Sequence, residues 1–502
     1  MSTSIKNFYY GIKNSKFTNE VNKFLNSVYF LALSAVLAVL GNAFGLELLV
    51  YGIIVLCGIF TAIFGEDFLP LLPAFAFCYI TPSTKNNPGK NPNSVFTFGN
   101  GAEYLVAMVG LFAIILIIRL IVDKNIGVRK AFKVKRKLTL GMVILGVAYI
   151  LSGLFSKGYF TRDTFINNLI FSVLQFVSLF AIYFIFAFAV KWEKVKKEYF
   201  LWIMFFVAFV VMAELITVYI QNDVAGKGNF DKALIYTGWG ICNNMGALMV
   251  MAMPASFYFA YKRNHGWIFS IIASLIFVAV IFSMSRASML FGAVVYALCV
   301  VMIIVKSKGK ARRNHLIVFG ILLALAIIIA CVFYKQILGM FATLVNNGLT
   351  NDSGRGNIYK AGLKQFIKAP IFGSTFFPVE YDLYSWSSTD LTAILPPRWH
   401  NTIVQLLASC GVVGLLAYAF HRFETVKLFL SEKNAESTFI AVCILGLLLT
   451  SLLDCHFFNL GPTMLYSMAL LFVEKAKLLT PKIDSKNSEM VAVDDTVNAE
   501  NG

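Results

Sequence analysis

The chain alternates long apolar segments with short polar connections along most of its 502 residues. A helix of about 20 apolar residues matches the thickness of the hydrocarbon core of a bilayer. We expect these segments to be helical, because lipid offers no hydrogen-bond partners to backbone groups and no alternating strand pattern is visible. The pattern predicts about 14 membrane-spanning helices, within a range of 12 to 14. The predicted spans are residues 24–42, 46–64, 67–81, 102–122, 138–156, 166–190, 200–220, 241–261, 267–285, 288–306, 316–334, 402–420, 438–454 and 463–474.

Polar segments divide the chain into five parts. Residues 1–23 form a cytoplasmic arm, 24–334 a helix bundle, 335–401 a large extracytoplasmic loop, 402–480 the C-terminal spans and 481–502 a disordered cytoplasmic tail. The loop is by far the longest connection, and loops of that length are usually functional or disordered. We expect no cleavable signal peptide, because no small-residue cleavage site follows the first apolar run. The predicted fold class is an all-α polytopic membrane protein whose large loop contains short amphipathic helices.

Charge sets the expected orientation in the membrane. Hydrophobic residues make up 58% of the chain and charged residues 14%, with a net charge of +17. If the N-terminus is inside, the inner segments hold 29 of the 43 Lys and Arg residues and the outer loops hold 13. The positive-inside rule then places both termini in the cytoplasm, and this distribution does not indicate nucleic-acid binding. The 8 Cys form no C-x-x-C pair, so we expect neither a disulfide framework nor a metal site.

The segment SGRGNIYKAGLKQFIKAP in the large loop has helical spacing. Its apolar positions are Tyr359, Leu363, Phe366 and Ile367, and its basic stripe is Lys360, Lys364 and Lys368. Ser353 is a candidate N-cap, and Pro370 a candidate stop. Two interpretations remain open: an amphipathic helix at the outer membrane surface, or a solvated helix packed on the bundle. In both, the loop folds back over the membrane.

Two arginines stand at predicted helix starts on the outer face. Arg286, in IFSMSRASMLFG, lies beside a helix N-terminus, whose free N–H groups favour an anion. A guanidinium there offers a bidentate donor to phosphate or carboxylate, although an arginine at a helix end also suits lipid headgroups. Arg355, in NDSGRGN, opens the loop helix in the same way or is an ordinary solvated residue.

Two further ionisable residues lie within predicted spans, where polarity is costly. Glu214 sits toward the outer end of its span and either pairs with an outer-face arginine or packs in its neutral form. Arg119 lies near an inner helix end, where its long side chain can reach the headgroups, and we interpret it as structural.

His400 closes the large loop immediately before an apolar run. The stretch from Thr402 to Gln405 has the form of a capping box, with Thr402 as the N-cap. His400 and Asn401 then lie just outside the helix, whose positive end favours a neutral imidazole able to accept a proton near pH 7. A structural role for the histidine, with Asn401 as a second cap, stays open. Together with two arginines, the histidine would suit a diphosphate leaving group and a hydroxyl nucleophile.

Several motifs together resemble the O-antigen ligase and O-antigen polymerase superfamily over residues 240–425. They are SR after an apolar span, GR followed by Y and A, APIFGS in the large loop, and HNTIVQLLASCGVVGLL after it. Ser409 and Cys410 stand where the family commonly has an acidic residue. The resemblance implies a multi-pass GT-C-type glycosyltransferase on the outer face of a bacterial cytoplasmic membrane. Its donor would be a polyprenyl-diphosphate-linked glycan and its acceptor a glycan or glycolipid, with no cofactor, metal or ATP.

The resemblance also implies roles for individual residues. Arg286 and Arg355 match the arginines assigned to the diphosphate, and His400 matches the histidine assigned to activation of the acceptor hydroxyl. Supporting candidates are Asn401, Glu214, Arg398 and Lys364. The motifs do not separate ligase from polymerase, because these differ in acceptor. A transporter or flippase for the same lipid-linked glycan is the alternative from another class, but we see no internal repeat or mid-membrane polar site of the kind expected for one.

Overall fold

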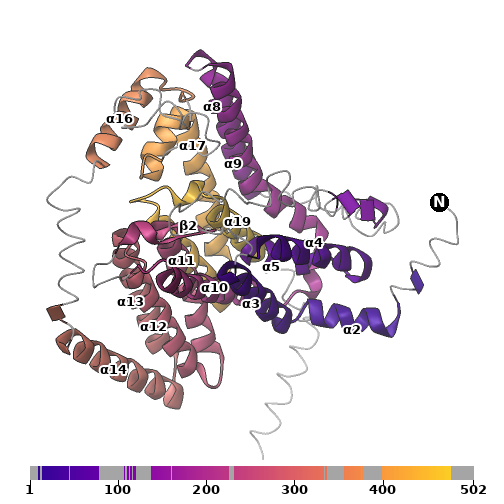
Figure 1. Cartoon of the computed structure of the whole chain (residues 1–502), viewed down its shortest axis with the longest axis vertical. Helices are drawn as coiled ribbons and strands as arrows, with labels where there is room; N and C mark the ends of the chain where they lie inside the picture. The colour runs from indigo at the N-terminus through magenta and orange to yellow at the C-terminus, as the bar shows by residue number, and fades with distance from the viewer. Residues whose placement is uncertain are drawn as a thin grey trace, which may run out of the picture.

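The computed structural model describes residues 10–11, 14–44, 46–77, 107, 110–111, 114–115, 117–119, 137–159, 161–224, 231–332, 334–335, 355–374, 376 and 398–475. These residues are mostly α-helical (Figure 1). The helices are α2 (Lys16–Leu25), α3 (Val28–Phe44), α4 (Glu47–Phe64), α5 (Leu72–Phe77), α8 (Lys137–Phe155), α9 (Arg162–Ala189), α10 (Tyr199–Gln221), α11 (Cys242–Lys262), α12 (Gly266–Phe282), α13 (Arg286–Lys306), α14 (Gly309–Val332), α16 (Arg355–Lys368), α17 (Thr402–Ser431), α18 (Ala435–Thr450) and α19 (Leu460–Lys475).

Short elements connect these helices. The 3₁₀ turns are η1 (Leu69–Leu71), η2 (Ser156–Gly158), η3 (Trp192–Lys194), η5 (Lys232–Leu234) and η8 (His456–Phe458). An antiparallel hairpin of two short strands, β1 (Tyr236–Thr237) and β2 (Gly240–Ile241), leads into α11. Its register pairs Tyr236 with Ile241 and Thr237 with Gly240. The hairpin therefore sets the point at which α11 enters the bundle.

The described helices confirm the predicted fold class of an all-α polytopic membrane protein. Six are long and apolar enough to span a membrane, or seven if the bent pair α2–α3 forms one span, and three shorter apolar helices accompany them within the described residues. Thirteen of the predicted spans coincide with a described helix, whereas residues 102–122 lie largely outside the described part. The predicted count of 12 to 14 spans therefore stays a prediction. Helix α17 extends beyond the predicted span 402–420 and continues to Ser431.

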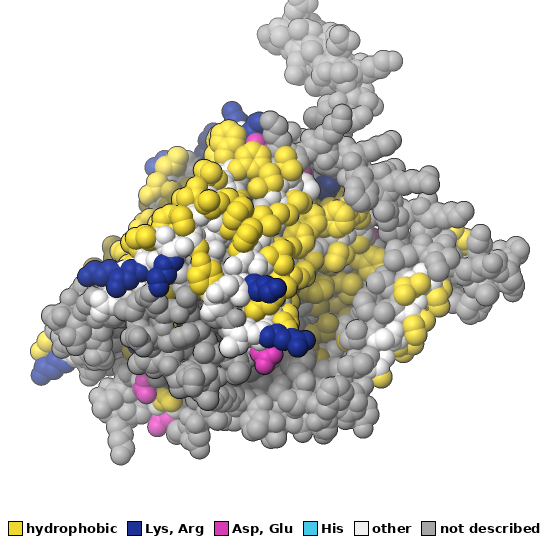
Figure 2. Space-filling model, turned by 90° about the horizontal axis from the view of Figure 1, so that it is seen from above, with side chains coloured by type: hydrophobic (Ala, Val, Ile, Leu, Met, Phe, Trp, Pro, Cys, Tyr) yellow, Lys and Arg dark blue, Asp and Glu magenta, His cyan; other side chains and the backbone are white. Residues whose placement is uncertain are grey.

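Helix α11 forms the centre of the bundle. Its residues are buried without interruption from Met245 to Ala260, and it packs against α10, α12, α13 and α18. Small residues allow this close packing: a Cβ added to Gly446 of α18 would lie 2.9 Å from the backbone oxygen of Val250. At the periphery, α14 buries only His315 and leaves its aliphatic side chains exposed, as expected for a lipid-facing helix. Hydrophobic side chains also dominate the described part of the face in Figure 2.

Gly411 interrupts α17, and Gly373 of the large loop packs against the interruption. Gly411 has φ 62° and ψ −159°, so the helix is interrupted there, and Gly373 in the loop also has a positive φ, 70°. The loop then supplies the hydrogen bonds that the broken helix lacks: the N–H of Val412 donates to Pro370 O at 2.8 Å, and that of Val413 to Ile371 O at 3.1 Å. A Cβ on either glycine would overlap the facing backbone. The APIFGS and CGVVG motifs therefore form the two sides of one contact between the large loop and α17.

Arg119 is structural, as the sequence predicts, but it does not reach the headgroups. Its side chain is 2% exposed, and its guanidinium donates to the backbone oxygens of Thr61, Ala62 and Gly65 at 2.6 to 3.1 Å. These carbonyls lie at the end of α4, where backbone acceptors have no partner within the helix. Arg119 therefore caps the C-terminus of α4 from inside the bundle.

Candidate functional site

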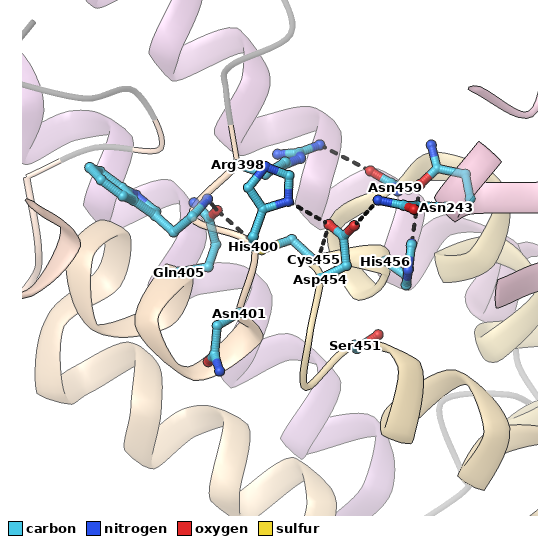
Figure 3. A network of polar contacts seen from close by, with 12 residues as sticks. Asn243, Arg398, His400, Asn401, Gln405, Ser451, Asp454, Cys455, His456 and Asn459 are labelled. Atoms are coloured by element: carbon cyan, nitrogen blue, oxygen red, sulfur yellow. Dashed lines mark hydrogen bonds and ion pairs between the residues drawn. The ribbon is translucent and has the colours of Figure 1, made fainter. Parts of the chain in front are cut away.

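Three segments with polar side chains meet at one end of the bundle: the first turn of α11, the start of α17, and the connection between α18 and α19 that contains η8 (Figure 3). Tyr359 of α16 also contacts this group, and the first turn of α13 packs on α11 beside it. His400 lies at the centre of this group, one residue before the N-cap of α17. The contacts around it define what the group can do chemically.

The start of α17 differs from the predicted capping box. Asn401 is the N-cap, because its side-chain oxygen accepts from the N–H groups of Ile403 and Val404 at 2.8 and 3.1 Å. Thr402 instead donates its hydroxyl to Ser451 O, at 2.9 Å. Gln405 reaches back six residues, where a capping box requires three, and its Oε1 accepts from the N–H of Trp399 at 3.1 Å. The predicted helix start at residue 402 is nevertheless correct.

The backbone of His400 adopts a left-handed conformation, with φ 51°. Such a conformation is uncommon for a residue other than glycine and costs about 1–3 kcal/mol, so its surroundings must hold it. Two contacts do this: the hydroxyl of Tyr359 on α16 donates to His400 O at 3.1 Å, and the preceding Trp399 is buried against Ala361 and Ala408. The imidazole is therefore presented in a defined direction.

Asp454 is the immediate partner of the His400 side chain. Its Oδ1 lies 3.2 Å from His400 Nδ1, and the two side chains are 9% and 30% exposed. Because a carboxylate only accepts hydrogen bonds, Nδ1 donates in this contact, and in the matching neutral tautomer Nε2 is the proton acceptor. Asp454 Oδ2 also accepts from Asn243 Nδ2 at 3.0 Å, and Oδ1 from the N–H of Cys455 at 2.8 Å.

The surroundings of Asp454 keep it ionised. Burial alone would raise the pKa of this carboxyl, but the nearby imidazole of His456, the hydrogen bond from His400 and the N–H of Cys455 outweigh burial and lower the pKa well below its usual value. A fixed negative charge therefore faces His400 at neutral pH. The arrangement of a buried carboxylate behind a partly exposed imidazole is one that orients a general base.

A second histidine lies beside this pair. His456, in η8, is fully buried, and its Nδ1 contacts Asn244 Oδ1 at 3.1 Å. The same oxygen accepts from Asn459 Nδ2 at 2.8 Å, so His456 Nδ1 is the donor. Burial is the largest influence on the pKa of His456 and lowers it, the guanidinium of Arg355 also lowers it, and the carboxylate of Asp454 acts in the opposite direction. The contact with Asn244 fixes η8 to the first turn of α11.

Arg286 is half-buried and is the first residue of α13. Ser285 is the N-cap, and Met284 before it has a left-handed backbone with φ 57°. The turn packs on α11, because a Cβ added to Gly246 would lie 2.6 Å from Ser288 Oγ and 2.7 Å from the Oγ of Ser283. On α11, Gly246 lies three residues after Asn243, which binds Asp454. The turn that carries Arg286 therefore packs about one helical turn from that asparagine.

Arg355 begins α16, one helical turn before the tyrosine that contacts His400. Its charge lowers the pKa of both Tyr359 and His456, although burial is the larger influence on each and raises that of the tyrosine. The structure thus brings Arg355 and Arg286 to the same end of the bundle as His400. The roles of all three remain predictions.

Helix α16 packs on α17 with a different face from the one predicted. Its buried residues are Ala361, Gly362 and Gln365, whereas Leu363 is 43% and Ile367 72% exposed. A Cβ on Gly362 would lie 2.6 Å from a side-chain carbon of Val404, so only a small residue fits there. The apolar positions that the sequence assigned to one face are therefore split, and those left exposed suit a membrane surface. Lys364 is exposed on this helix.

Two supporting candidates have other contacts. Arg398 Nη2 donates to the backbone oxygen of Phe458 at 3.0 Å and lies over the ring of Phe171, so it holds η8 in place. Glu214 is buried in α10 and accepts a hydrogen bond from Asn42 of α3. Among the described residues it forms no ion pair with an arginine, so the structure favours the packing interpretation over the outer-face ion pair.

Asp454, Asn243 and His456 were missed by the sequence reasoning. The predicted span 438–454 ended on Asp454, and an aspartate within an apolar run is itself a functional signal. The structure ends α18 at Thr450 and leaves Asp454 in the connection. Across the described parts of the chain, no group of three or more His, Cys, Asp or Glu side chains has the geometry to hold a metal ion.

Comparison with known proteins agrees with the sequence motifs. A family model described as O-antigen ligase matches residues 244–419, which run from the first turn of α11 through α16 and His400 to α17. A search of curated proteins gave no match. The matched region contains Arg286, Arg355 and His400, whereas Asp454 and His456 lie beyond it. Residues 244–419 therefore match an O-antigen ligase domain, and this match supports membership of the chain in the O-antigen ligase and polymerase superfamily.

Proposed function

We propose that this protein transfers a glycan from a polyprenyl-diphosphate carrier to the hydroxyl of an acceptor, with His400 as the general base. The observation that carries the proposal is the contact of His400 Nδ1 with Asp454 at 3.2 Å, which leaves Nε2 as the proton acceptor on the exposed side of the pair. General bases of this kind contribute roughly 10²–10⁴-fold to a rate. The family match supports this class of reaction.

The proposed reaction has one bond-forming and one bond-breaking event. His400 Nε2 takes the proton of the acceptor hydroxyl, and the oxygen attacks the anomeric carbon of the donor sugar. The bond from that carbon to the diphosphate oxygen breaks, and the carrier diphosphate leaves with the electron pair. Arg286 and Arg355, each at the start of a helix, would hold the diphosphate, since helix N-termini and guanidinium groups both favour anions. Their contacts would strengthen as negative charge grows on the leaving group.

The proposed setting is the outer face of a bacterial cytoplasmic membrane, with both termini in the cytoplasm. The distribution of Lys and Arg supports this orientation. The leaving diphosphate already activates the donor, so the reaction needs neither ATP nor a nucleotide sugar, and we propose that it needs no divalent metal. The acceptor is either the core sugar of a lipid, as for a ligase, or a growing surface polysaccharide, as for a polymerase.

Variants of the three residues test the assignment of roles. In proteoliposomes supplied with lipid-linked glycan and acceptor, His400→Gln should lower kcat by at least about 10²-fold and leave the donor Kd within about threefold. Arg286→Ala and Arg355→Ala should instead raise the donor Kd by about 10-fold or more, because each removes a charge-assisted contact worth roughly 1.5–3 kcal/mol. Arg312→Ala, an exposed arginine of α14 outside the site, is the matched control and should change neither value. Full activity of all three site variants would refute the assignment.

A further inference from the structure

A cavity of about 380 Å³ lies at the N-terminal corner of the bundle, enclosed by α2, α3, α4 and the start of α5. Apolar side chains form almost all of its wall. The inner wall is buried, since Leu25, Ala38 and Val50 are 5%, 1% and 4% exposed. The volume falls within the range of sites that hold small molecules or lipid chains. No residue of the proposed transfer site lines it.

The mouth of the cavity is also apolar. Leu33 on α3 and Leu56 and Phe60 on α4 line it and are 46%, 46% and 47% exposed. In a membrane protein, exposed aliphatic and aromatic side chains on spanning helices face the hydrocarbon rather than water. The cavity therefore opens sideways into the bilayer, where a lipid chain can enter it without crossing an aqueous phase.

Helix α2 brings positive charge close to this mouth. It bends by 62° from α3, and Asn22 ties it to α4 by donating to Phe64 O at 2.8 Å. Lys16 and Lys23 are exposed and lie seven residues apart, so they share one face of the helix. Glu20 lies between them and pairs with Lys23 at 2.7 Å, so this face carries one net positive charge. Each lysine precedes an exposed phenylalanine: Phe17 is 64% exposed, and Phe24, which lines the cavity, is 44% exposed. This pairing is typical of a helix that lies at the membrane surface, with rings in the hydrocarbon and lysines at the headgroups.

We propose that this cavity binds one acyl chain of an anionic phospholipid, with the lipid phosphate beside Lys16 and Lys23. The site lies at the opposite end of the bundle from His400. Helix α10 begins shortly after Lys194, which pairs with Glu66 beside Asn22 of α2, and its other end contacts strand β1 of the hairpin that leads into α11. Its 23 residues span about 34 Å. The lipid therefore belongs to the leaflet that does not hold the proposed diphosphate site, and the inference does not depend on the proposed reaction.

Native mass spectrometry of the purified protein, titrated with phosphatidylglycerol or phosphatidylethanolamine of equal chain length, tests the proposal. We expect one retained phosphatidylglycerol with roughly fivefold tighter binding than the zwitterionic lipid, because the one net positive charge left by the Lys23–Glu20 pair is worth about 1 kcal/mol near the surface. Leu37→Trp places an indole in the cavity and should abolish this binding, whereas Leu40→Trp, an exposed residue of α3 outside the lining, should not. Equal retention by both variants, or binding of polyprenyl phosphate but not phospholipid, would overturn the proposal.

A second measurement uses the wild-type chain and so avoids any folding defect of the tryptophan variant. Cys57 lines the cavity and is a free thiol. Bound phosphatidylglycerol should slow its reaction with N-ethylmaleimide at least fivefold in detergent, as read by peptide mass spectrometry. Cys331 is exposed on α14, outside the cavity, and its labelling should stay unchanged. Equal labelling of Cys57 with and without phosphatidylglycerol contradicts the proposal.

Discussion

Replacement of Asp454 by asparagine changes the charge behind His400 with little change in shape. Asp454 Oδ1 accepts from His400 Nδ1 at 3.2 Å, and the carboxylate also holds Asn243 and the N–H of Cys455. In the variant, an amide NH₂ can face Nδ1 and donate to it. His400 would then carry its proton on Nε2, where the proposed reaction needs a lone pair.

The expected magnitude follows from two effects. Loss of one charge-assisted hydrogen bond costs roughly 1.5–3 kcal/mol, which is about a 10- to 150-fold change. The wrong tautomer adds to this, and the corresponding substitution in a Ser-His-Asp triad lowers kcat by about 10⁴-fold. We therefore expect Asp454→Asn to lower kcat by about 10²–10⁴-fold while the donor Kd changes by less than about threefold. The assay is transfer of labelled glycan in proteoliposomes, with the donor Kd measured separately.

A matched control separates this effect from a loss of stability. Asp67 is also buried and accepts two backbone hydrogen bonds, from Leu69 at 3.1 Å and Lys191 at 2.9 Å, but it lies near η1 rather than at the site. Asp67→Asn should lower the Tm and leave kcat per folded molecule unchanged. If Asp454→Asn keeps kcat within about threefold of the wild type, the orienting role of Asp454 is refuted.

Three further outcomes are expected. Tyr359→Phe removes the 3.1 Å hydrogen bond to His400 O and should lower kcat about 3- to 10-fold, with a Tm shift of no more than a few degrees; an unchanged kcat would argue against a positioning role. Gly411→Ala should destabilise the protein by at least about 2 kcal/mol in denaturant unfolding, because its φ is 62° and a Cβ would meet the loop backbone. Because its pKa is lowered, Asp454 should contribute fully to stability above about pH 4 and lose that contribution only as the pH falls through its folded-state pKa. The Tm difference between wild type and Asp454→Asn should thus persist at both pH 8 and pH 5, and a difference that vanishes at pH 5 would contradict the lowered pKa.

Much of the fold follows from hydrophobic patterning. Apolar runs of bilayer length leave the backbone no alternative to a helix, so nearly every predicted span with described residues coincides with a helix. The ends of helices were harder to predict, because they depend on tertiary contacts. Asn401 caps α17 in place of Thr402, since the threonine hydroxyl is taken by Ser451 O from a neighbouring helix. Hydrophobic patterning likewise did not predict that α17 extends to Ser431, beyond the predicted span 402–420.

The candidate site was predictable only in part. His400, Arg286 and Arg355 stand at helix starts, and local rules identify helix starts. Asp454 meets His400 across 54 positions of sequence, and no local rule predicts that contact. In the sequence, Asp454 is recognisable only as an ionisable residue at the end of an apolar run, where such residues are rare. The contact between the loop at Gly373 and α17 at Gly411 is likewise a long-range feature, although both glycines stand in the motifs that carry the family resemblance.

The central claim is that the chain cleaves the bond between a glycan and its carrier diphosphate and passes the glycan to a hydroxyl. The most direct measurement is made on purified wild-type protein in proteoliposomes with a donor labelled in both glycan and carrier, an acceptor, excess EDTA and no ATP. We expect the acceptor to gain labelled glycan and one carrier diphosphate to be released for each glycan transferred. A donor that crosses the bilayer with its glycan still attached, and no glycan on the acceptor, would contradict it.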